Sequence, residues 1–313
     1  MPELGPAIDT VLRRCLRVGA GDDVLVIVDP GTREIGLALW DGARGLGADA
    51  VLAEMDERPT HGSDPPRSVA AAMMATDVVI APTTKSLSHA PARKRATDAG
   101  TRVATLPGVT ADMLARVMAV DFEPMARRSR AVAELLTQGS RARVTCPRGT
   151  DLQLDLGSRA AISDAGELGT PGAFGNLPCG EGFIAPIGGQ GRIVASSLAP
   201  LGLSDPPATL AVHDGRITGA EGGHGPEFLA RLQAHGEPGT NLAELGVGTN
   251  DRATLSGNIL EDEKILGTVH VAFGASAAFG GSVSVPIHLD VVVLDASLEV
   301  DGRPVLDSGR FVL

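Results

Sequence analysis

The chain has 313 residues, which suggests two domains of ordinary size rather than one compact core. Hydrophobic residues make up 43% of the sequence and charged residues 21%, a balance that excludes an intrinsically disordered chain. The formal net charge of −11 argues against a nucleic-acid partner, because binding to phosphates relies on lysine and arginine.

The sequence also argues against a membrane partner. Apolar runs such as residues 24–28 and 291–294 are far shorter than the ~20 residues that span a bilayer. The first residues lack the basic and apolar regions of a signal peptide. Three cysteines (Cys15, Cys146 and Cys179) without a CxxC motif argue against a disulfide framework. We therefore expect a cytoplasmic location.

Residues 1–138 show alternating strand and helix patterns. The expected strands are short apolar runs, at residues 23–28, 50–53, 78–81 and 101–105. Helical patterns lie between these runs, an alternation typical of a parallel sheet covered on both faces. Right-handed crossovers would wind this sheet into a Rossmann-like α/β domain. The loop at residues 29–32 lacks GxGxxG and a Walker lysine, which argues against a nucleotide site.

The pattern changes after the segment Thr137-Gln-Gly-Ser140, where we place the domain boundary. Residues 142–156 and 210–218 alternate between apolar and polar side chains around turns and predict two β-hairpins. The expected second domain, residues 139–313, is therefore a β-rich α+β domain. Residues 141–313 carry 20 acids and 11 bases. This excess indicates either a solvated acidic surface or a pocket that gathers cations, and composition does not decide between them.

The strongest chemical pattern is His288-Leu-Asp290 at the start of a β-branched run. Side chains at positions i and i+2 of a strand project from the same face, so an imidazole and a carboxylate placed this way can share a metal ion. The alternative is a surface strand whose polar side carries both residues. His270, between valines, is by itself more typical of a satisfied core residue.

Isolated carboxylates add to this pattern. Glu181 and Glu244 lie in segments that are otherwise rich in glycine, proline or apolar residues, and Glu261, Asp262 and Glu263 come seven to nine residues before His270. A carboxylate in such surroundings is costly unless it is paired or bound to a metal. Together with two histidines, these carboxylates predict a metal site in the second domain.

Four blocks resemble the aminopeptidase T/S type of leucyl aminopeptidase. In chain order they are Asn-Leu-Pro-x-Gly-Glu, Ala-Glu-Leu-Gly-x-Gly-Thr-Asn, Glu-Asp-Glu-Lys with His-Val-Ala-Phe-Gly, and His-x-Asp. The resemblance covers about residues 140–300. It implies a two-domain, typically dimeric metallopeptidase with two divalent ions, here zinc, cobalt or manganese. The ligands that it implies are Glu181, Glu244, His270, His288 and Asp290.

One departure from the family concerns the substrate. The peptidases place a tyrosine shortly after the histidine block, whereas this chain has Ala275-Ser-Ala-Ala-Phe279 there and no tyrosine at all. The segment between His270 and His288 is also shorter than in the peptidases. Cleavage of ordinary peptides is therefore less strongly indicated than metal binding. The same superfamily includes a 2,5-dihydroxypyridine 5,6-dioxygenase branch, whose iron is held by two histidines and an aspartate.

Three functions follow from these observations. The main prediction is a metallohydrolase that cleaves an amide or related C–N bond of a small or short peptide-like substrate. In it a metal-activated water attacks, and Glu263, or else Glu181, acts as the base. The alternative is a ring-cleaving dioxygenase with one ferrous ion on His270, His288 and Asp290, the composition of a 2-His-1-carboxylate triad. A catalytically idle binding protein ranks last, because all five ligand positions hold ligand-competent residues.

Overall fold

The computed structural model describes residues 3–312, which divide into two compact units. Unit 1 comprises Met1–Val120 and Gly166–Cys179, and unit 2 comprises Asp121–Ala165 and Gly180–Leu313. The α/β class with a parallel-sheet unit and a β-rich unit, predicted from the sequence, is confirmed. No helix among the described residues is long and apolar enough to cross a bilayer.

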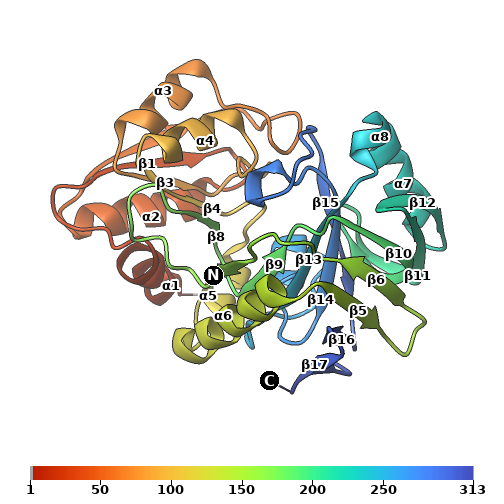
Figure 1. Ribbon diagram of the computed structural model, residues 1–313. Helices are drawn as coiled ribbons and strands as arrows, with labels where there is room; N and C mark the ends of the chain where they lie inside the picture. The colour runs from red at the N-terminus through yellow and green to blue at the C-terminus, as the bar shows by residue number, and fades with distance from the viewer. Residues whose placement is uncertain (1–2, 313) are drawn as a thin grey trace. The chain divides into compact units, whose positions relative to one another are not determined.

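Unit 1 is built on a five-stranded parallel sheet in the order β2-β1-β3-β4-β8 (Figure 1). The strands are β1 (Asp23–Val28), β2 (Asp49–Glu54), β3 (Val78–Ala81), β4 (Arg102–Thr105) and β8 (Phe174–Asn176). The helical segments are α1 (Gly5–Asp9), η1 (Thr10–Cys15), α2 (Arg33–Gly45), α3 (Arg67–Ala75), α4 (Pro91–Asp98) and α5 (Ala111–Val117).

Helices cover both faces of this sheet, as the continuous apolar strands predict. On one face, Leu25 and Ile27 pack in a cluster with Met73 of α3 and Ala96 of α4. On the other face, α2 lies so close to β1 that a Cβ atom added to Gly36 would come within 2.0 Å of Val28 Cγ1. The glycine therefore sets how closely the helix approaches the sheet.

Unit 2 contains a 13-stranded sheet within the described residues. Its main order is β18-β17-β16-β5-β6-β10-β15-β14-β13-β9-β7, and β11 and β12 branch from β10. The first strands along the chain are β5 (Arg141–Thr145), β6 (Asp151–Asp155), β7 (Ile162–Asp164), β9 (Glu181–Ile184), β10 (Gly188–Leu198), β11 (Gly202–His213) and β12 (Arg216–Glu221). The others are β13 (Leu242–Gly248), β14 (Val269–Gly274), β15 (His288–Val293), β16 (Ser297–Val300), β17 (Arg303–Asp307) and β18 (Arg310–Phe311).

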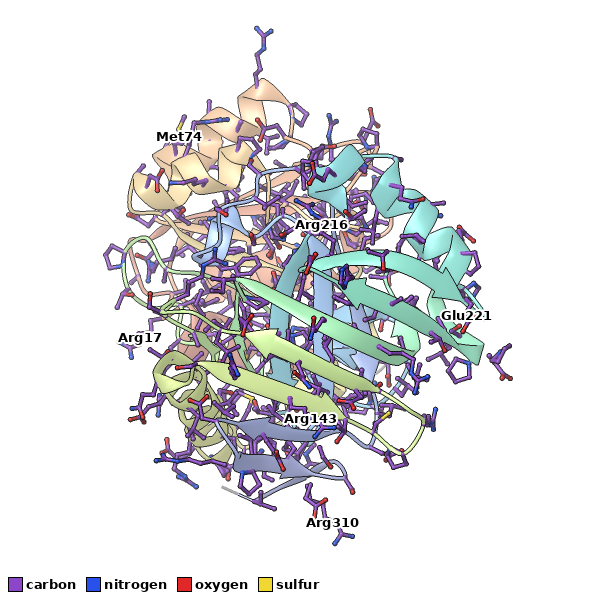
Figure 2. All side chains as sticks on the ribbon, turned by 45° about the vertical axis from the view of Figure 1, so that its right-hand side comes forward. Arg17, Met74, Arg143, Arg216, Glu221 and Arg310 are labelled. Atoms are coloured by element: carbon purple, nitrogen blue, oxygen red, sulfur yellow. The ribbon has the colours of Figure 1, made fainter. Side chains whose placement is uncertain are left out.

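The helical segments of unit 2 are few. They are α6 (Phe122–Gln138), α7 (Gly225–Gln233), α8 (Gly236–Gly239), α9 (Ile259–Asp262) and η2 (Ala277–Phe279). Both predicted hairpins are present, as β5–β6 and β11–β12. Asp214 and Gly215 both have positive φ in the second hairpin, the conformation of a type I′ turn. Charged side chains such as Arg143 and Arg310 lie on the outer surface of the unit (Figure 2).

The observed division differs from a single boundary between residues 138 and 139. Helix α6 belongs to unit 2, because its apolar stripe, which includes Val132 and Leu136, packs in the core of that unit. Residues 166–179 belong to unit 1, because β8 extends the parallel sheet through the pair Val103 and Phe174. The sequence did not predict β8, since three residues are too few to show a pattern.

Candidate metal centre

The candidate ligands come from three neighbouring antiparallel strands of unit 2, β13, β14 and β15. Val269, Val271 and Phe273 of β14 face the hydrophobic core. His270 and Ala272 therefore project from the opposite face, because successive side chains of a strand alternate. The strand therefore has one apolar face, which packs in the core, and one face that holds the candidate ligands.

The strand register brings the other candidates to the same face. Ala272 is paired with Glu244 on one side and with Asp290 on the other. His288 is two residues from Asp290 and therefore shares its face, as the His-x-Asp spacing predicts. On the next strand, Glu181 of β9 pairs with Gly248 of β13. The structure thus brings together all five residues that the resemblance implied.

Glu244 lies at the centre of this group. Its Oε1 is 3.3 Å from Nε2 of His270, and its Oε2 is 3.5 Å from Nε2 of His288. Oδ1 of Asp290 lies 3.6 Å from the same nitrogen of His288, and Oε2 of Glu181 lies 3.1 Å from Nε2 of His270. The donors form two overlapping sets that share Glu244, each with one ligand atom per residue within 4.8 Å: Glu181, Glu244 and His270, and Glu244, His288 and Asp290.

Small residues make room for these side chains. A Cβ atom on Gly246 would lie 2.0 Å from Nε2 of His270, so the imidazole occupies the space above this glycine. Ala272 stands between the two carboxylates of Glu244 and Asp290 and has only a methyl group. A larger residue at either position would intrude on the donors.

The orientation of His288 is set by a backbone acceptor. Its Nδ1 donates a hydrogen bond to the carbonyl oxygen of Ala275 at 2.8 Å. This bond fixes the tautomer that presents Nε2 to Glu244 and Asp290, the arrangement by which metal-binding histidines are usually held.

The donor atoms of these residues suit a divalent cation. Glu181 Oε2 is buried and makes no hydrogen bond within the part of the chain that the structure describes, although it lies 3.1 Å from Nε2 of His270. A buried oxygen left unsatisfied beside an imidazole costs free energy, which a bound cation would recover. Imidazole nitrogens and carboxylate oxygens are also the donors that iron and zinc accept. A divalent metal site thus fits this face of unit 2.

Electrostatics lead to the same conclusion. Burial by itself lowers the pKa of His270, but the adjoining carboxylates of Glu181 and Glu244 raise it to about 10. The pKa of His288 is likewise raised, since Asp290 and Glu244 outweigh burial. Burial opposes ionisation of Glu244, yet both imidazoles lower its pKa to about 2. The carboxylates therefore attract positive charge strongly, which either protons on the histidines or a cation can supply.

A buried lysine, which the sequence analysis missed, adjoins the ligands. Lys264 is completely buried, and its Nζ donates to Oε1 of Glu181 and to Oε1 of Glu263, each at 2.6 Å. These bonds place Glu263 next to the donor sets but outside them. Burial raises the pKa of Glu263 to about 8, although Lys264 opposes the rise. The sequence signal was available, because Lys264 is followed by the apolar run Ile265-Leu266.

The neighbouring carboxylates have a different role. Glu261 accepts hydrogen bonds from the amide and hydroxyl of Thr254, at 2.7 and 3.0 Å. Asp262 accepts from Ser197 Oγ at 2.7 Å and from the amides of Ser256 and Gly257. These two side chains hold the loop before α9, so of the three consecutive acids only Glu263 faces the centre.

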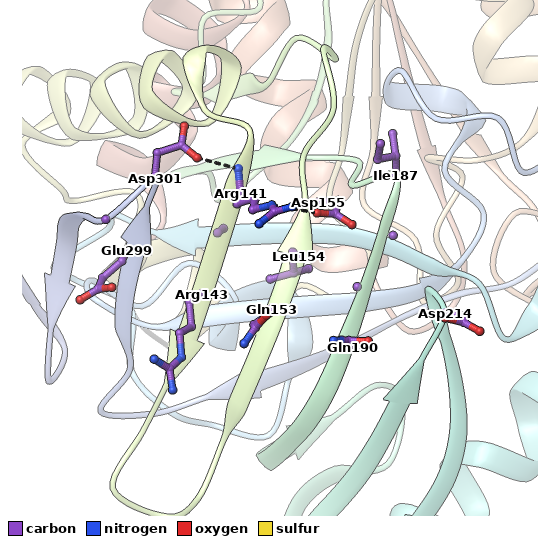
Figure 3. Close-up of a pocket in the computed structure, with 14 residues that line it drawn as sticks. Arg141, Arg143, Gln153, Leu154, Asp155, Ile187, Gln190, Asp214, Glu299 and Asp301 are labelled. Carbon is purple, nitrogen blue, oxygen red and sulfur yellow. Dashed lines mark hydrogen bonds and ion pairs between the residues drawn. The ribbon is translucent and has the colours of Figure 1, made fainter.

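A hollow of about 750 Å³ on unit 2 lies away from these ligands (Figure 3). It lies over the outer face of β5, β6 and β10, where its lining includes Arg141, Asp155 and Gln190. None of the five candidate ligands lines it. Its charges are already paired in part, since Arg141 lies 3.7 Å from Asp155.

Comparisons with known proteins identify the family. A family model, NicX, described as 2,5-dihydroxypyridine 5,6-dioxygenase, matches residues 3–313. The 2,5-dihydroxypyridine 5,6-dioxygenase of Pseudomonas putida is 26% identical over 258 residues, which cover 77% of this chain and 72% of that protein. The solved structure of the dioxygenase from Pseudomonas putida KT2440 has a TM-score of 0.86 at 22% identity and covers 99% of this chain and 96% of that one.

A second solved structure, AmpT from Thermus thermophilus, has a TM-score of 0.72 at 19% identity, with 99% of each chain covered. This likeness shows a shared fold and leaves the aminopeptidase T/S assignment unconfirmed. The predicted metallohydrolase function is wrong, together with its aminopeptidase and protease descriptions, because the family match and the curated relative are dioxygenases. The same donor types serve both chemistries, and ligand composition could not separate them. With a family model that spans residues 3–313, the chain belongs to the 2,5-dihydroxypyridine 5,6-dioxygenase family.

Proposed function

We propose that this protein is a ferrous-iron-dependent dioxygenase that opens the ring of 2,5-dihydroxypyridine or a closely related dihydroxylated N-heterocycle. The family match supports the reaction class. The observation that carries the proposal at the level of residues is the convergence of two imidazoles and Asp290 on one face of β14 and β15. This was the alternative function in the sequence analysis.

In this proposal His270, His288 and Asp290 hold the iron, and Glu244 is a further candidate ligand between the two imidazoles. A donor set of two histidines and one carboxylate is typical of iron enzymes that leave positions open for other ligands. When bound, ferrous iron supplies the redox chemistry and the open positions that ring opening by dioxygen requires. The family match supports iron, whereas a pair of zinc, cobalt or manganese ions has no support from the comparisons.

The remaining polar residues have distinct proposed roles. Glu263, whose pKa of about 8 lies near physiological pH, would accept or return a proton of a substrate hydroxyl. Lys264 would fix the positions of Glu181 and Glu263 through its two hydrogen bonds. Glu181, whose Oε2 is 3.1 Å from Nε2 of His270, is another candidate ligand beside that imidazole. A homodimer stays a prediction, which sedimentation analysis would test.

Metal analysis and oxygen uptake together test this function. Protein purified without added metal and then loaded anaerobically with Fe²⁺ should bind about one iron per chain. It should consume one dioxygen for each 2,5-dihydroxypyridine that disappears, with loss of the ring absorbance. Zinc-loaded protein serves as the control and should consume no oxygen. Iron-loaded protein that leaves both substrates untouched would contradict the proposal.

A further inference from the structure

Two phenylalanines lie beside the candidate ligands. Phe183 of β9 is paired in register with Gly246, which is itself paired with His270 on the next strand. Directly paired residues project from the same face of a sheet, so Phe183 lies on the side that carries the metal donors. Neither the metal centre nor the proposed proton transfer uses this side chain.

Phe279 joins Phe183 to the metal centre. Its ring centroid is 5.6 Å from that of Phe183, at an interplanar angle of 72°, and 5.6 Å from that of His288, at 88°. Both are edge-to-face arrangements within the normal range for aromatic pairs. Phe183 and Phe279 are each only partly buried. An aromatic surface therefore remains accessible next to a proposed ligand.

The turn that carries Phe279 is held by several hydrogen bonds. The amides of Ser276 and Ala277 donate to the carbonyl oxygen of Val283, at 2.9 and 3.0 Å, and Gly281 N donates to Ser276 O at 2.9 Å. Gly280 follows η2 with φ of +96°, a conformation that favours glycine. Ala275, at the start of this segment, also orients His288. One segment thus positions both the proposed ligand and the aromatic ring.

Charged side chains are unevenly distributed around Phe279. The donor face is rich in carboxylates, whereas residues 271–287 contain no acidic or basic side chain. A molecule that bridges these two regions needs polar groups at one edge and a flat apolar face at the other. A dihydroxylated aromatic ring has this form, and a saturated ring of the same polarity lacks the flat π-face.

We propose that Phe183 and Phe279 form an aromatic wall of the substrate site that selects flat, ring-shaped substrates, with Phe279 as the specificity-determining residue. The inference rests on the proposed function for the identity of the ring. It goes beyond that function because it assigns substrate selection to two residues outside the metal centre.

Anaerobic calorimetry of the iron-loaded protein tests the wall without turnover. The probes are 2,5-dihydroxypyridine and, as the saturated counterpart, cyclohexane-1,4-diol. Phe279→Leu keeps an apolar side chain but removes the ring. It should weaken binding of the pyridine ~3- to 10-fold, the range expected for one aromatic contact, and leave the diol unaffected. The double variant Phe183→Leu with Phe279→Leu should weaken binding of the pyridine further. Phe311→Leu, on β18 at the far end of the sheet order, is the matched control and should bind as the wild type does.

Other outcomes separate this inference from the proposed function. Equal affinity of wild type and Phe279→Leu for the pyridine would overturn the wall, as would an equal loss for both probes. A fall in iron affinity that accounts for the whole effect would also overturn it, because Phe279 would then only support His288. Wild-type protein that binds the pyridine with the expected dependence on Phe279 but consumes no oxygen would support the wall and refute the dioxygenase reaction.

Discussion

The imidazole of His270 lies directly over the backbone of Gly246 on the neighbouring strand. A Cβ atom at residue 246 would come within 2.0 Å of Nε2, closer than non-bonded atoms approach. The glycine and the histidine are paired in register, so their relationship is built into the sheet itself. Because Nε2 is the nitrogen that faces Glu181 and Glu244, the space above Gly246 is part of the metal site.

Gly246→Ala should therefore displace His270 and weaken iron binding by at least ~10-fold, with a corresponding loss of activity. Overpacking by one methyl group typically costs about 1–3 kcal/mol, so the fold should persist. Iron titration monitored by calorimetry would measure the effect. The control is Gly219→Ala on β12, where the nearest atom to the added Cβ would be Ala211 Cβ at an ordinary 3.7 Å. Normal iron affinity in Gly246→Ala would show that His270 is not a ligand.

His288→Ala and Glu244→Ala test the centre of the donor group. Each change removes a donor that lies within 3.5 Å of the other, and each should abolish stoichiometric iron binding while the chain stays folded. His213→Ala is a matched control, because His213 also lies near a carboxylate, at 3.3 Å from Asp214, but is exposed at the end of β11. Unchanged iron stoichiometry and affinity in both site variants would refute the ligand assignment.

Lys264→Met should destabilise the protein by about 3–5 kcal/mol, the usual cost of leaving a buried charge without its partner. The change leaves Glu181 and Glu263 buried without the ammonium group that both contact at 2.6 Å. Urea denaturation of the metal-free protein would measure the loss. Adding Glu181→Gln to Lys264→Met should recover part of it, since Glu181, whose pKa is lowered to about 2, is the carboxylate left uncompensated. Full stability of Lys264→Met would mean that these carboxylates are protonated in the native state.

Local periodicity accounts for what could be predicted from the sequence. Alternation along β14 and β15 determines that His270, His288 and Asp290 lie on the face opposite to the core valines Val269, Val271, Val291 and Val293, and this needs only the strand period. The hairpin at Asp214-Gly215 follows from turn chemistry. The parallel sheet of unit 1 follows from apolar runs that alternate with helices.

Long-range pairing accounts for what could not be predicted. Lys264 meets Glu181 across 83 residues of sequence, and no local pattern shows this contact. The assignment of α6 to unit 2 depends on which core its stripe packs against. The reaction was mispredicted for a chemical reason. Histidine and carboxylate ligands bind the metal ions of both hydrolases and oxygenases, so the ligand types do not determine which reaction the metal catalyses.

Glu263→Gln should keep iron but lose turnover by ~10²- to 10⁴-fold, the usual range for general acid–base assistance. The amide is nearly the same size as the carboxylic acid but cannot exchange a proton. Stopped-flow oxygen consumption and iron analysis on the same samples would separate the two effects. Glu261→Gln, which alters a carboxylate bonded to Thr254 outside the donor sets, is the comparison. Normal turnover in Glu263→Gln would move the proton role to another group.

The last prediction concerns how pH affects the metal-free and iron-loaded protein. The pKa of His270 is raised from 6.5 to about 10. Its contribution to the stability of the folded state is therefore complete below pH 6.5 and is lost as pH rises through 10. The pKa of Glu263 is raised from 4.5 to about 8, which also lowers stability as pH rises through that interval. The pKa of Glu244 is lowered from 4.5 to about 2, so its contribution is lost as pH falls through that range.

The metal-free protein should therefore be most stable near pH 4.5, where the Glu244 contribution is complete and those of Glu263 and His270 have not begun to fall, and become less stable on either side. Iron reverses the alkaline trend, because it binds neutral imidazole and must displace the protons that the histidines hold. The stabilisation by Fe²⁺, measured anaerobically as the shift in urea midpoint, should thus increase from pH 6 to pH 8. His288→Ala should show almost none of this increase, whereas His213→Ala should show all of it. A stabilisation by iron that does not depend on pH would mean that the two histidines are not its ligands.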